Sequence, residues 1–303
     1  MDWRSGIEAA AARIAGHVRI TPVTTLDLPD IGTVEVKLEN LQHTGSFKAR
    51  GAFNTLIAGP VPPAGVVAAS GGNHGAAVAH AAARLGVPAT IYVPEIAGPA
   101  KIALIRSQGA DLVVVPGFYP DAAARAATHA AETGAMQVHA YDAVPTLEGQ
   151  GTLLREWEVQ GLQADTVLIA VGGGGLIGGT LAWNAGRRKV VAVEPELAPT
   201  LHRALAEGAD SQITVGGIAA NALGAVKIGR LAYGLAQGVP SVLVTDAAIA
   251  EAQVMLWRTL RQLVEPAGAT ALAALLSGAY VPEPGERVAI LVCGANPAPD
   301  PFG

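Results

Sequence analysis

The chain has 303 residues, of which 50% are hydrophobic, 15% charged and 4% aromatic, with a formal net charge of −5. This apolar composition excludes a disordered chain, and the acidic balance argues against a nucleic-acid partner. A single cysteine, Cys293, excludes an internal disulfide and a cysteine-cluster zinc site. We therefore expect a compact protein in a reducing compartment, the cytoplasm.

Three features of the sequence indicate whether the chain crosses a membrane, carries a signal peptide or has a regulatory domain. Residues 166–186 carry no charge and have the length of a membrane span, but six glycines between 172 and 179 would make a poor helix in lipid. We therefore expect no membrane partner. The charged first residues predict no signal peptide. Only ten residues follow Cys293, so we expect no regulatory domain there.

Short runs of β-branched residues alternate with alanine-rich stretches along nearly the whole chain. A helix over 7–17 and an extended Thr21-Pro22 segment come first. The later strands are predicted at 34–38, 66–69, 89–93, 112–115, 167–171, 190–193, 241–244 and 287–292. Helices are predicted near 73–85, 100–108, 121–133, 176–185 and 249–263. This alternation is typical of parallel βαβ units and predicts a doubly wound α/β protein.

Lys48 is one of only five lysines and lies where a helix is predicted to begin, near Ser46. The positive end of a helix dipole disfavours an ammonium group and favours the neutral, nucleophilic amine. Lys48 is therefore a candidate Schiff-base lysine. The alternative is a surface lysine on an amphipathic helix.

A second motif, SGGNHG at 70–75, joins a predicted strand to a predicted helix. Backbone N–H groups at such a turn bind anions, and glycines allow a carboxylate or phosphate to approach closely. The alternative is that Ser70 or Asn73 only caps the helix.

A third motif, VGGGGL at 171–176, also lies between a strand and a helix. Its glycines match the dinucleotide fingerprint, and Glu194 ends the next strand at about the right distance to bind a ribose. Four consecutive glycines are more than that turn requires and suggest a nest of N–H groups around one phosphate. A reactive lysine, an anion turn and a phosphate nest together indicate pyridoxal phosphate with an amino-acid substrate.

These residues resemble a known family. The motifs that carry the resemblance are QHTGSFKARGA at 42–52, SGGNHG, VGGGGL, EGQGT at 148–152, Glu194-Pro195 and EPAGA at 265–269. Together they resemble the fold-type II pyridoxal-phosphate enzymes. The likeness is to the serine/threonine dehydratase and serine racemase group and runs nearly end to end. It implies a tryptophan synthase β-like fold of two doubly wound parallel-sheet domains with the cofactor in the cleft between them. Residues 1–44 and 142–303 would form the large domain and 45–141 the small one, and a homodimer is implied.

The resemblance also implies roles for individual residues. Lys48 would bind the cofactor covalently and act as the catalytic base. The substrate carboxylate would be bound by Ser70, Gly71, Asn73 and His74. The remaining cofactor contacts would be Phe47, Asn73, Gly172, Gly173, Gly174, Gly175, Leu176 and Cys293, the last at the pyridine nitrogen.

Two departures from the family pattern modify these expectations. Racemases of this group have a serine as second base where this chain has Gly71, so we expect elimination rather than racemisation. The family's cation site has an acid where this chain has Thr200. Glu194 is then a weak metal candidate, and no metal is expected.

The resulting prediction is a lyase of amino-acid metabolism, an ammonia-lyase (dehydratase) that converts a β-hydroxy amino acid such as L-threonine or L-serine to a 2-oxo acid and ammonia. Alternatives within the fold are a dehydratase for an unusual β-substituted serine, such as a β-aryl or β-carboxy serine, a β-replacement enzyme, or an amino-acid racemase. A non-catalytic pyridoxal-phosphate-binding protein is the alternative from another class.

Overall fold

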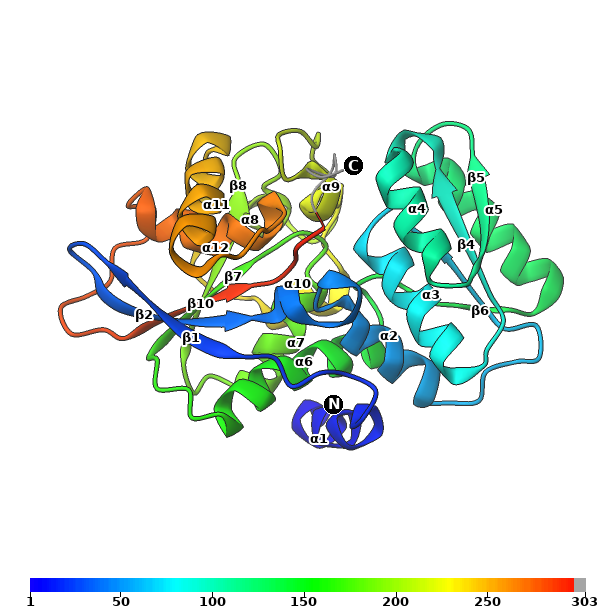
Figure 1. The fold of residues 1–303 in the computed structure, drawn as a ribbon, viewed down its shortest axis with the longest axis horizontal. Helices are drawn as coiled ribbons and strands as arrows, with labels where there is room; N and C mark the ends of the chain where they lie inside the picture. The colour runs from blue at the N-terminus through cyan, green and yellow to red at the C-terminus, as the bar shows by residue number, and fades with distance from the viewer. Residues whose placement is uncertain (297–303) are drawn as a thin grey trace.

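The computed structural model describes residues 1–296, whose strands form two sheets with helices packed around them (Figure 1). The larger sheet has the strand order β1-β2-β10-β7-β8-β9. Its strands are β1 (Val23–Leu28), β2 (Gly32–Leu38), β7 (Thr166–Ala170), β8 (Lys189–Pro195), β9 (Ser241–Val244) and β10 (Val288–Val292). All its neighbours pair in parallel except β1, which forms an antiparallel hairpin with β2.

The smaller sheet is wholly parallel, with the order β5-β4-β3-β6. Its strands are β3 (Val66–Ala69), β4 (Ala89–Pro94), β5 (Asp111–Val115) and β6 (Met136–Gln137). All four come from one continuous stretch of the chain, whereas strands from both sides of that stretch build the larger sheet.

The α-helices are α1 (Trp3–Ile14), α2 (Lys48–Ile57), α3 (Asn73–Leu85), α4 (Pro99–Ser107), α5 (Tyr119–Thr133), α6 (Val144–Val159), α7 (Gly175–Asn184), α8 (Thr200–Glu207), α9 (Ala220–Leu223), α10 (Arg230–Leu235), α11 (Asp246–Leu260) and α12 (Pro266–Leu276). Short 3-10 turns occur at Glu39–Leu41, His43–Gly45 and Glu95–Ala97. Helix α2 packs against both α3 and α6 and so joins the two parts of the molecule. Within residues 1–296, no helix has the length and apolar character needed to cross a membrane.

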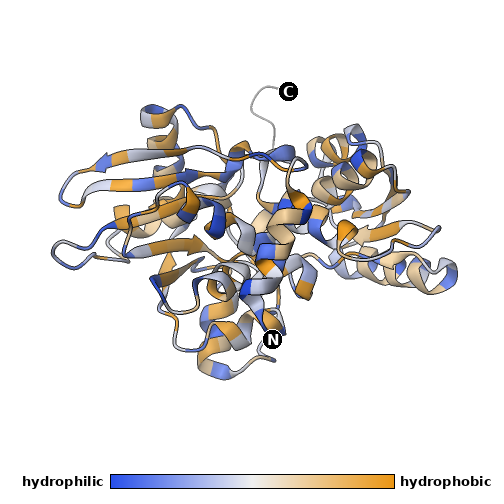
Figure 2. Cartoon of the chain, turned by 90° about the horizontal axis from the view of Figure 1, so that it is seen from below, coloured by the Kyte–Doolittle hydropathy of each residue, from blue (hydrophilic) through white to orange (hydrophobic). Residues whose placement is uncertain are grey.

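Each sheet is covered by helices and has a hydrophobic core of its own. Helices α11 and α12 lie on one side of the larger sheet and α1, α6 and α7 on the other (Figure 1). The core of the larger sheet is one cluster, and the smaller sheet has two clusters, one of them against α5. Hydrophobic segments are accordingly found in both parts of the molecule (Figure 2). Burial of these apolar side chains is the main stabilising contribution in both parts of the molecule.

The predicted fold class, two α/β domains with parallel sheets, is confirmed, and each predicted strand corresponds to an observed one. The antiparallel β1 and the short β6 were not predicted. The helices α6, α8, α9, α10 and α12 were also missed. Helix α2 begins at Lys48, two residues after the predicted start.

Candidate functional site

A cavity of about 780 Å³ lies between loops that follow strands of both sheets. It is bordered by every residue predicted to contact cofactor or substrate carboxylate, namely Phe47, Lys48, Ser70, Gly71, Asn73, His74, Gly172, Gly173, Gly174, Gly175, Leu176 and Cys293. Four segments far apart in the sequence therefore meet at one place. Such an assembly at the carboxyl ends of parallel strands is where α/β proteins usually bind ligands.

Lys48 begins helix α2, and the chain just before it is attached to the strand β10 exit. Ser46 forms a β-bridge with Gly294, and Phe47 N–H donates to the Cys293 carbonyl at 3.2 Å. The Lys48 amine donates to the carbonyl of Ala140 at 2.8 Å. Burial lowers the pKa of Lys48 to about 8, although Cys293 and Glu265 act in the opposite direction. The lysine is thus held in the cavity with an amine that loses its proton easily.

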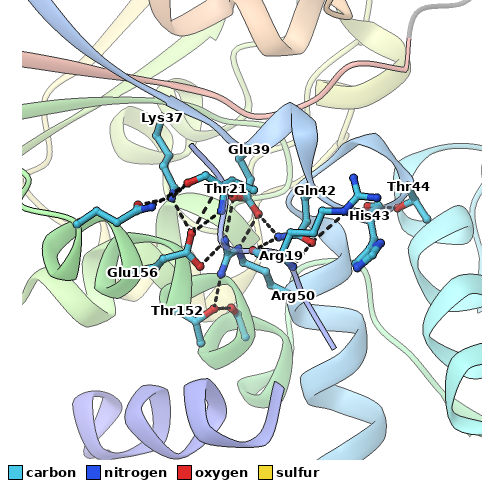
Figure 3. A network of polar contacts seen from close by, with 12 residues as sticks. Arg19, Thr21, Lys37, Glu39, Gln42, His43, Thr44, Arg50, Thr152 and Glu156 are labelled. Atoms are coloured by element: carbon cyan, nitrogen blue, oxygen red, sulfur yellow. Dashed lines mark hydrogen bonds and ion pairs between the residues drawn. The ribbon is translucent and has the colours of Figure 1, made fainter. Parts of the chain in front are cut away.

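A buried polar network fixes the helix that carries Lys48 (Figure 3). Arg50, two residues further on, is 1% exposed and donates to both oxygens of Glu39, at 2.6 and 3.0 Å. Its guanidinium also lies 2.9 Å from Glu156 of α6, which pairs with Lys37 of β2 at 2.6 Å. These charges compensate one another in the interior and connect β2, α2 and α6.

The turn at 70–75 leads from β3 into α3, which begins at Asn73. Gly72 N–H donates to the Ser70 hydroxyl at 3.2 Å, which closes the turn. Gly71 is tightly placed, since a Cβ built on it would lie 2.4 Å from the Cβ of Ala97. Helix α3 points its unpaired first N–H groups toward this turn. An anion at the turn would therefore be stabilised by the helix terminus.

The imidazole of His74 is directed at the protein rather than at the solvent. Its Nε2 lies 3.0 Å from the Val138 carbonyl. Burial, with a further contribution from Lys48, lowers the pKa of His74 to about 3, so the ring is neutral. A neutral His74 positions the turn but adds no charge to it.

Glu265 was not selected from the sequence as a site residue, yet it borders the cavity. Its carboxylate accepts from the Asn73 amide at 2.6 Å, and Asn73 Oδ1 accepts from Asn296 at 2.7 Å. Burial raises the pKa of Glu265 to about 7, against the effect of the Asn73 hydrogen bond. The sequence signal was present, because Glu265 precedes a proline at a helix start, but its contact with Asn73 spans 192 positions.

The glycine run between β7 and α7 forms a cradle in which side chains do not fit. Gly174 has φ +93°, which favours glycine, and a Cβ there would lie 2.5 Å from that of Ala232. A Cβ on Gly173 would lie 2.4 Å from the Tyr141 ring. Because α7 begins at Gly175, its first N–H groups are available to the cavity. This donor set suits a phosphate group.

Cys293 lies at the end of β10, 3% exposed, with its thiol donating to the Ala267 carbonyl at 3.4 Å. Burial raises the pKa of this thiol, and Glu265 raises it further. Cys293 is therefore a neutral thiol at the cavity wall.

Glu194 lies outside the cavity. Its two oxygens accept from the N–H groups of Leu201 and His202, each at 2.7 Å, so the carboxylate caps the start of α8. Thr200 donates its hydroxyl to the Ala225 carbonyl instead. In the part of the chain that the structure describes, no group of three or more His, Cys, Asp or Glu side chains is arranged to hold a metal ion.

The cavity thus has the Lys48 amine on one segment and the glycine run at 172–175 on another, and this pair of groups fits pyridoxal phosphate. Comparisons with known proteins lead to the same cofactor. Residues 14–294 match the family described as "Pyridoxal-phosphate dependent enzyme". The chain is 37% identical over 304 residues to a phenylserine dehydratase from Ralstonia pickettii, covering 96% of this chain and 92% of the relative.

Two further relatives extend the comparison. An L-threonine ammonia-lyase from Geobacter sulfurreducens is 36% identical over 85% of this chain and 66% of its own length. The structure of maize serine racemase superimposes with a TM-score of 0.90 at 32% identity, covering 97% of this chain and 93% of the racemase. The chain therefore belongs to the family of pyridoxal-phosphate dependent enzymes, which confirms the cofactor predicted from its three motifs.

Proposed function

We propose that the protein is an ammonia-lyase that converts a β-hydroxy amino acid, such as L-threonine or L-serine, to a 2-oxo acid and ammonia by α,β-elimination. The observation that carries this proposal is the meeting of the Lys48 amine, the 70–75 turn and the glycine cradle around one cavity. The names of the two curated relatives, a dehydratase and an ammonia-lyase, support the same reaction.

In this proposal the chain's residues bind the substrate and move its protons. Pyridoxal phosphate, when bound, supplies the electron sink that makes the substrate Cα acidic. The cradle at 172–175 binds the phosphate, and the 70–75 turn binds the substrate carboxylate. Lys48 takes the proton from Cα, and its pKa of about 8 gives it a larger neutral fraction near neutral pH than an ordinary lysine has. Loss of the β-hydroxyl as water and hydrolysis of the resulting enamine then give the 2-oxo acid and ammonia.

A lysine replacement tests the mechanism. Lys48→Ala should abolish 2-oxo acid release from L-serine and L-threonine, whereas Lys189→Ala should not, because Lys189 is a surface residue paired with Glu286. Unchanged turnover in Lys48→Ala would refute the role of this lysine. Absence of 2-oxo acid from every β-hydroxy amino acid tried with the wild type would refute the function.

Aromatic residues at the cavity favour a second candidate, a dehydratase for a β-aryl serine. Phe118 and Tyr119 border the cavity and are 65% and 51% exposed, and Ile96, which also borders it, is 64% exposed. Such large exposed apolar side chains at a cavity are typical of ligand contacts. Phe118→Ala should then lower kcat/KM for phenylserine and leave that for L-serine nearly unchanged. Equal effects on both substrates would argue against an aryl site.

The domain limits, oligomeric state and location are also proposals. We infer a large domain of residues 1–44 and 142–303 and a small domain of residues 45–141, supported by the separate origins of the two sheets. The family resemblance supports a homodimer, and a single free cysteine, Cys293, supports a reducing compartment such as the cytoplasm. Light scattering of the purified holoenzyme tests the dimer, and a monomeric mass would refute it.

A further inference from the structure

Three lysines border the cavity. One of them is the proposed catalytic base, and another forms an ion pair. Lys48 donates to Ala140 and is the proposed base. Lys227 pairs with Asp210 at 2.5 Å. The third, Lys101 on α4, takes part in neither arrangement. None of the described residues that border the cavity is an arginine.

Among residues 1–296, Lys101 is a buried amine that forms no ion pair, although the carboxylate of Glu265 at the same cavity acts on it from a longer distance. Lys101 is 7% exposed, and its amine has one long hydrogen bond, 3.5 Å to the Asn221 carbonyl. Within residues 1–296, no carboxylate lies at ion-pair distance from it. A buried ammonium group without a directly paired carboxylate is costly, so this arrangement favours an anion bound in the cavity beside Lys101.

The position of Lys101 indicates which anion that is. A Cβ built on Gly72 would lie 3.8 Å from the Lys101 amine and 3.6 Å from the Asn221 carbonyl oxygen. The amine therefore lies beside the 70–75 turn and faces the same part of the cavity. The α-carboxylate is the anionic group that all amino-acid substrates have in common. That group is the one that the turn is proposed to receive.

We propose that Lys101 binds the α-carboxylate of the substrate together with the backbone N–H groups of the 70–75 turn, an inference that rests on the proposed function. Lys101 would supply the positive charge that the turn itself lacks, since His74 is neutral. Its hydrogen bond to the Asn221 carbonyl connects α4 to α9 of the larger domain. Lys101 is then a substrate-binding residue in addition to those the motifs indicated.

The test compares Lys101→Met with the wild type on L-serine and on L-serinamide, which lacks the carboxylate charge. A hydrogen bond to a charged group is worth about 10- to 100-fold in affinity, so kcat/KM for L-serine should fall by about that factor, mainly through KM. For L-serinamide the fall should be less than about threefold. Lys101→Arg should restore part of the L-serine activity because it keeps the charge.

Lys227→Met is the matched control, because Lys227 borders the same cavity but is already paired. It should change kcat/KM for the two compounds by the same factor. Equal losses on L-serine and L-serinamide in Lys101→Met, or no loss on either, would overturn the proposal.

A binding measurement separates this proposal from the reaction. L-alanine has the carboxylate but no leaving group, and its Kd for the holoenzyme can be followed by the change in cofactor absorbance. Lys101→Met should weaken L-alanine binding by about 10- to 100-fold and L-alaninamide binding little. An unchanged L-alanine Kd would refute the role of Lys101, even if the enzyme proves to have another substrate.

Discussion

Lys48 differs from an ordinary lysine in what surrounds its amine. Surface lysines keep a proton at neutral pH, whereas burial lowers the pKa of Lys48 to about 8. Its backbone is held by the Ser46–Gly294 bridge, so the amine enters the cavity from a fixed position. Both features support the proposal that Lys48 binds the cofactor and accepts a proton from the substrate.

A pH dependence of cofactor uptake follows from this pKa. Only the neutral amine reacts, so the rate at which apoenzyme takes up pyridoxal phosphate should rise about tenfold per pH unit below about 8 and level off above it. The measurement is the appearance of cofactor absorbance after mixing, between pH 6 and pH 10. N-acetyl-lysine methylamide, with an ordinary pKa, should show a rate that still rises above pH 9. A protein rate that rises in parallel with it would contradict the lowered pKa.

Gly71 determines whether a second base can be placed in the cavity. The family resemblance implies that racemases have a serine there, and the structure leaves no space for one, because a Cβ would lie 2.4 Å from that of Ala97. Overpacking of this kind typically costs about 1–3 kcal/mol. Position 71 therefore lacks the hydroxyl of a second base, and Ala97 also leaves no space for a serine side chain there.

A double variant tests whether Gly71 and Ala97 together prevent racemisation. Wild type should form much less D-serine than pyruvate from L-serine, and Gly71→Ser alone should lower both rates and the Tm. Gly71→Ser combined with Ala97→Gly should recover stability and raise the ratio of D-serine to pyruvate. Chiral chromatography measures this ratio. A wild-type ratio near one would show that racemisation does not need a hydroxyl at position 71.

At the residue scale, the sequence predicted those site residues that lie in contiguous motifs. Lys48, the 70–75 turn and the glycine run could be proposed because each is a local pattern with its own chemistry, and all three border one cavity. Glu265 and Lys101 were missed because their roles depend on contacts across the fold, with Asn73 and with Asn221. A lone buried charge leaves no local pattern in the sequence.

At the scale of elements, helix α2 is held by charges rather than by apolar packing alone. Arg50→Met would leave Glu39, which is fully buried, without its cation. Loss of one partner of a buried pair typically costs about 3–5 kcal/mol, so urea unfolding should show a loss of that size. The matched control is Arg155→Met, since the Arg155–Glu8 pair is exposed and worth about 0–1 kcal/mol. Equal effects of the two variants would contradict a structural role for the buried network.

Two of the helices that were not predicted, α6 and α12, lack a typical helical pattern for different reasons. Helix α12 is apolar on all sides, because it lies buried between the larger sheet and α11, and so it has no amphipathic period. Helix α6 contains Gly149 and Gly151, and glycine is unfavourable in a helix interior. A Cβ on Gly149 would lie 2.6 Å from the Cα of Gly51 in α2, so the glycine allows two helices to cross closely. Part of the high glycine content therefore serves helix packing rather than ligand binding.

At the scale of the whole molecule, two sheets with separate cores share one ligand site. Parallel strands were recognised from their β-branched runs, but the antiparallel β1 was not, because its pairing depends on a turn at 29–31 rather than on a βαβ unit. The cavity itself could be anticipated only from the family resemblance. Its formation depends on how the 70–75 turn of one sheet faces the 172–175 loop of the other.

A ligand held by both parts of the molecule should stabilise the fold as a whole. Binding to the folded state alone contributes about 2.7 kcal/mol at a ligand concentration 100 times Kd. Pyridoxal phosphate should therefore raise the Tm of apoenzyme more than pyridoxal or inorganic phosphate does at the same concentration, because only the complete cofactor reaches both Lys48 and the cradle.

In Lys48→Ala the gain in Tm from pyridoxal phosphate should shrink but persist, since the cradle remains. Gly174→Ala should lose most of the phosphate-dependent gain, because its φ of +93° and the contact with Ala232 both oppose a Cβ. Equal Tm gains from pyridoxal and pyridoxal phosphate would show that the glycine run does not bind the phosphate.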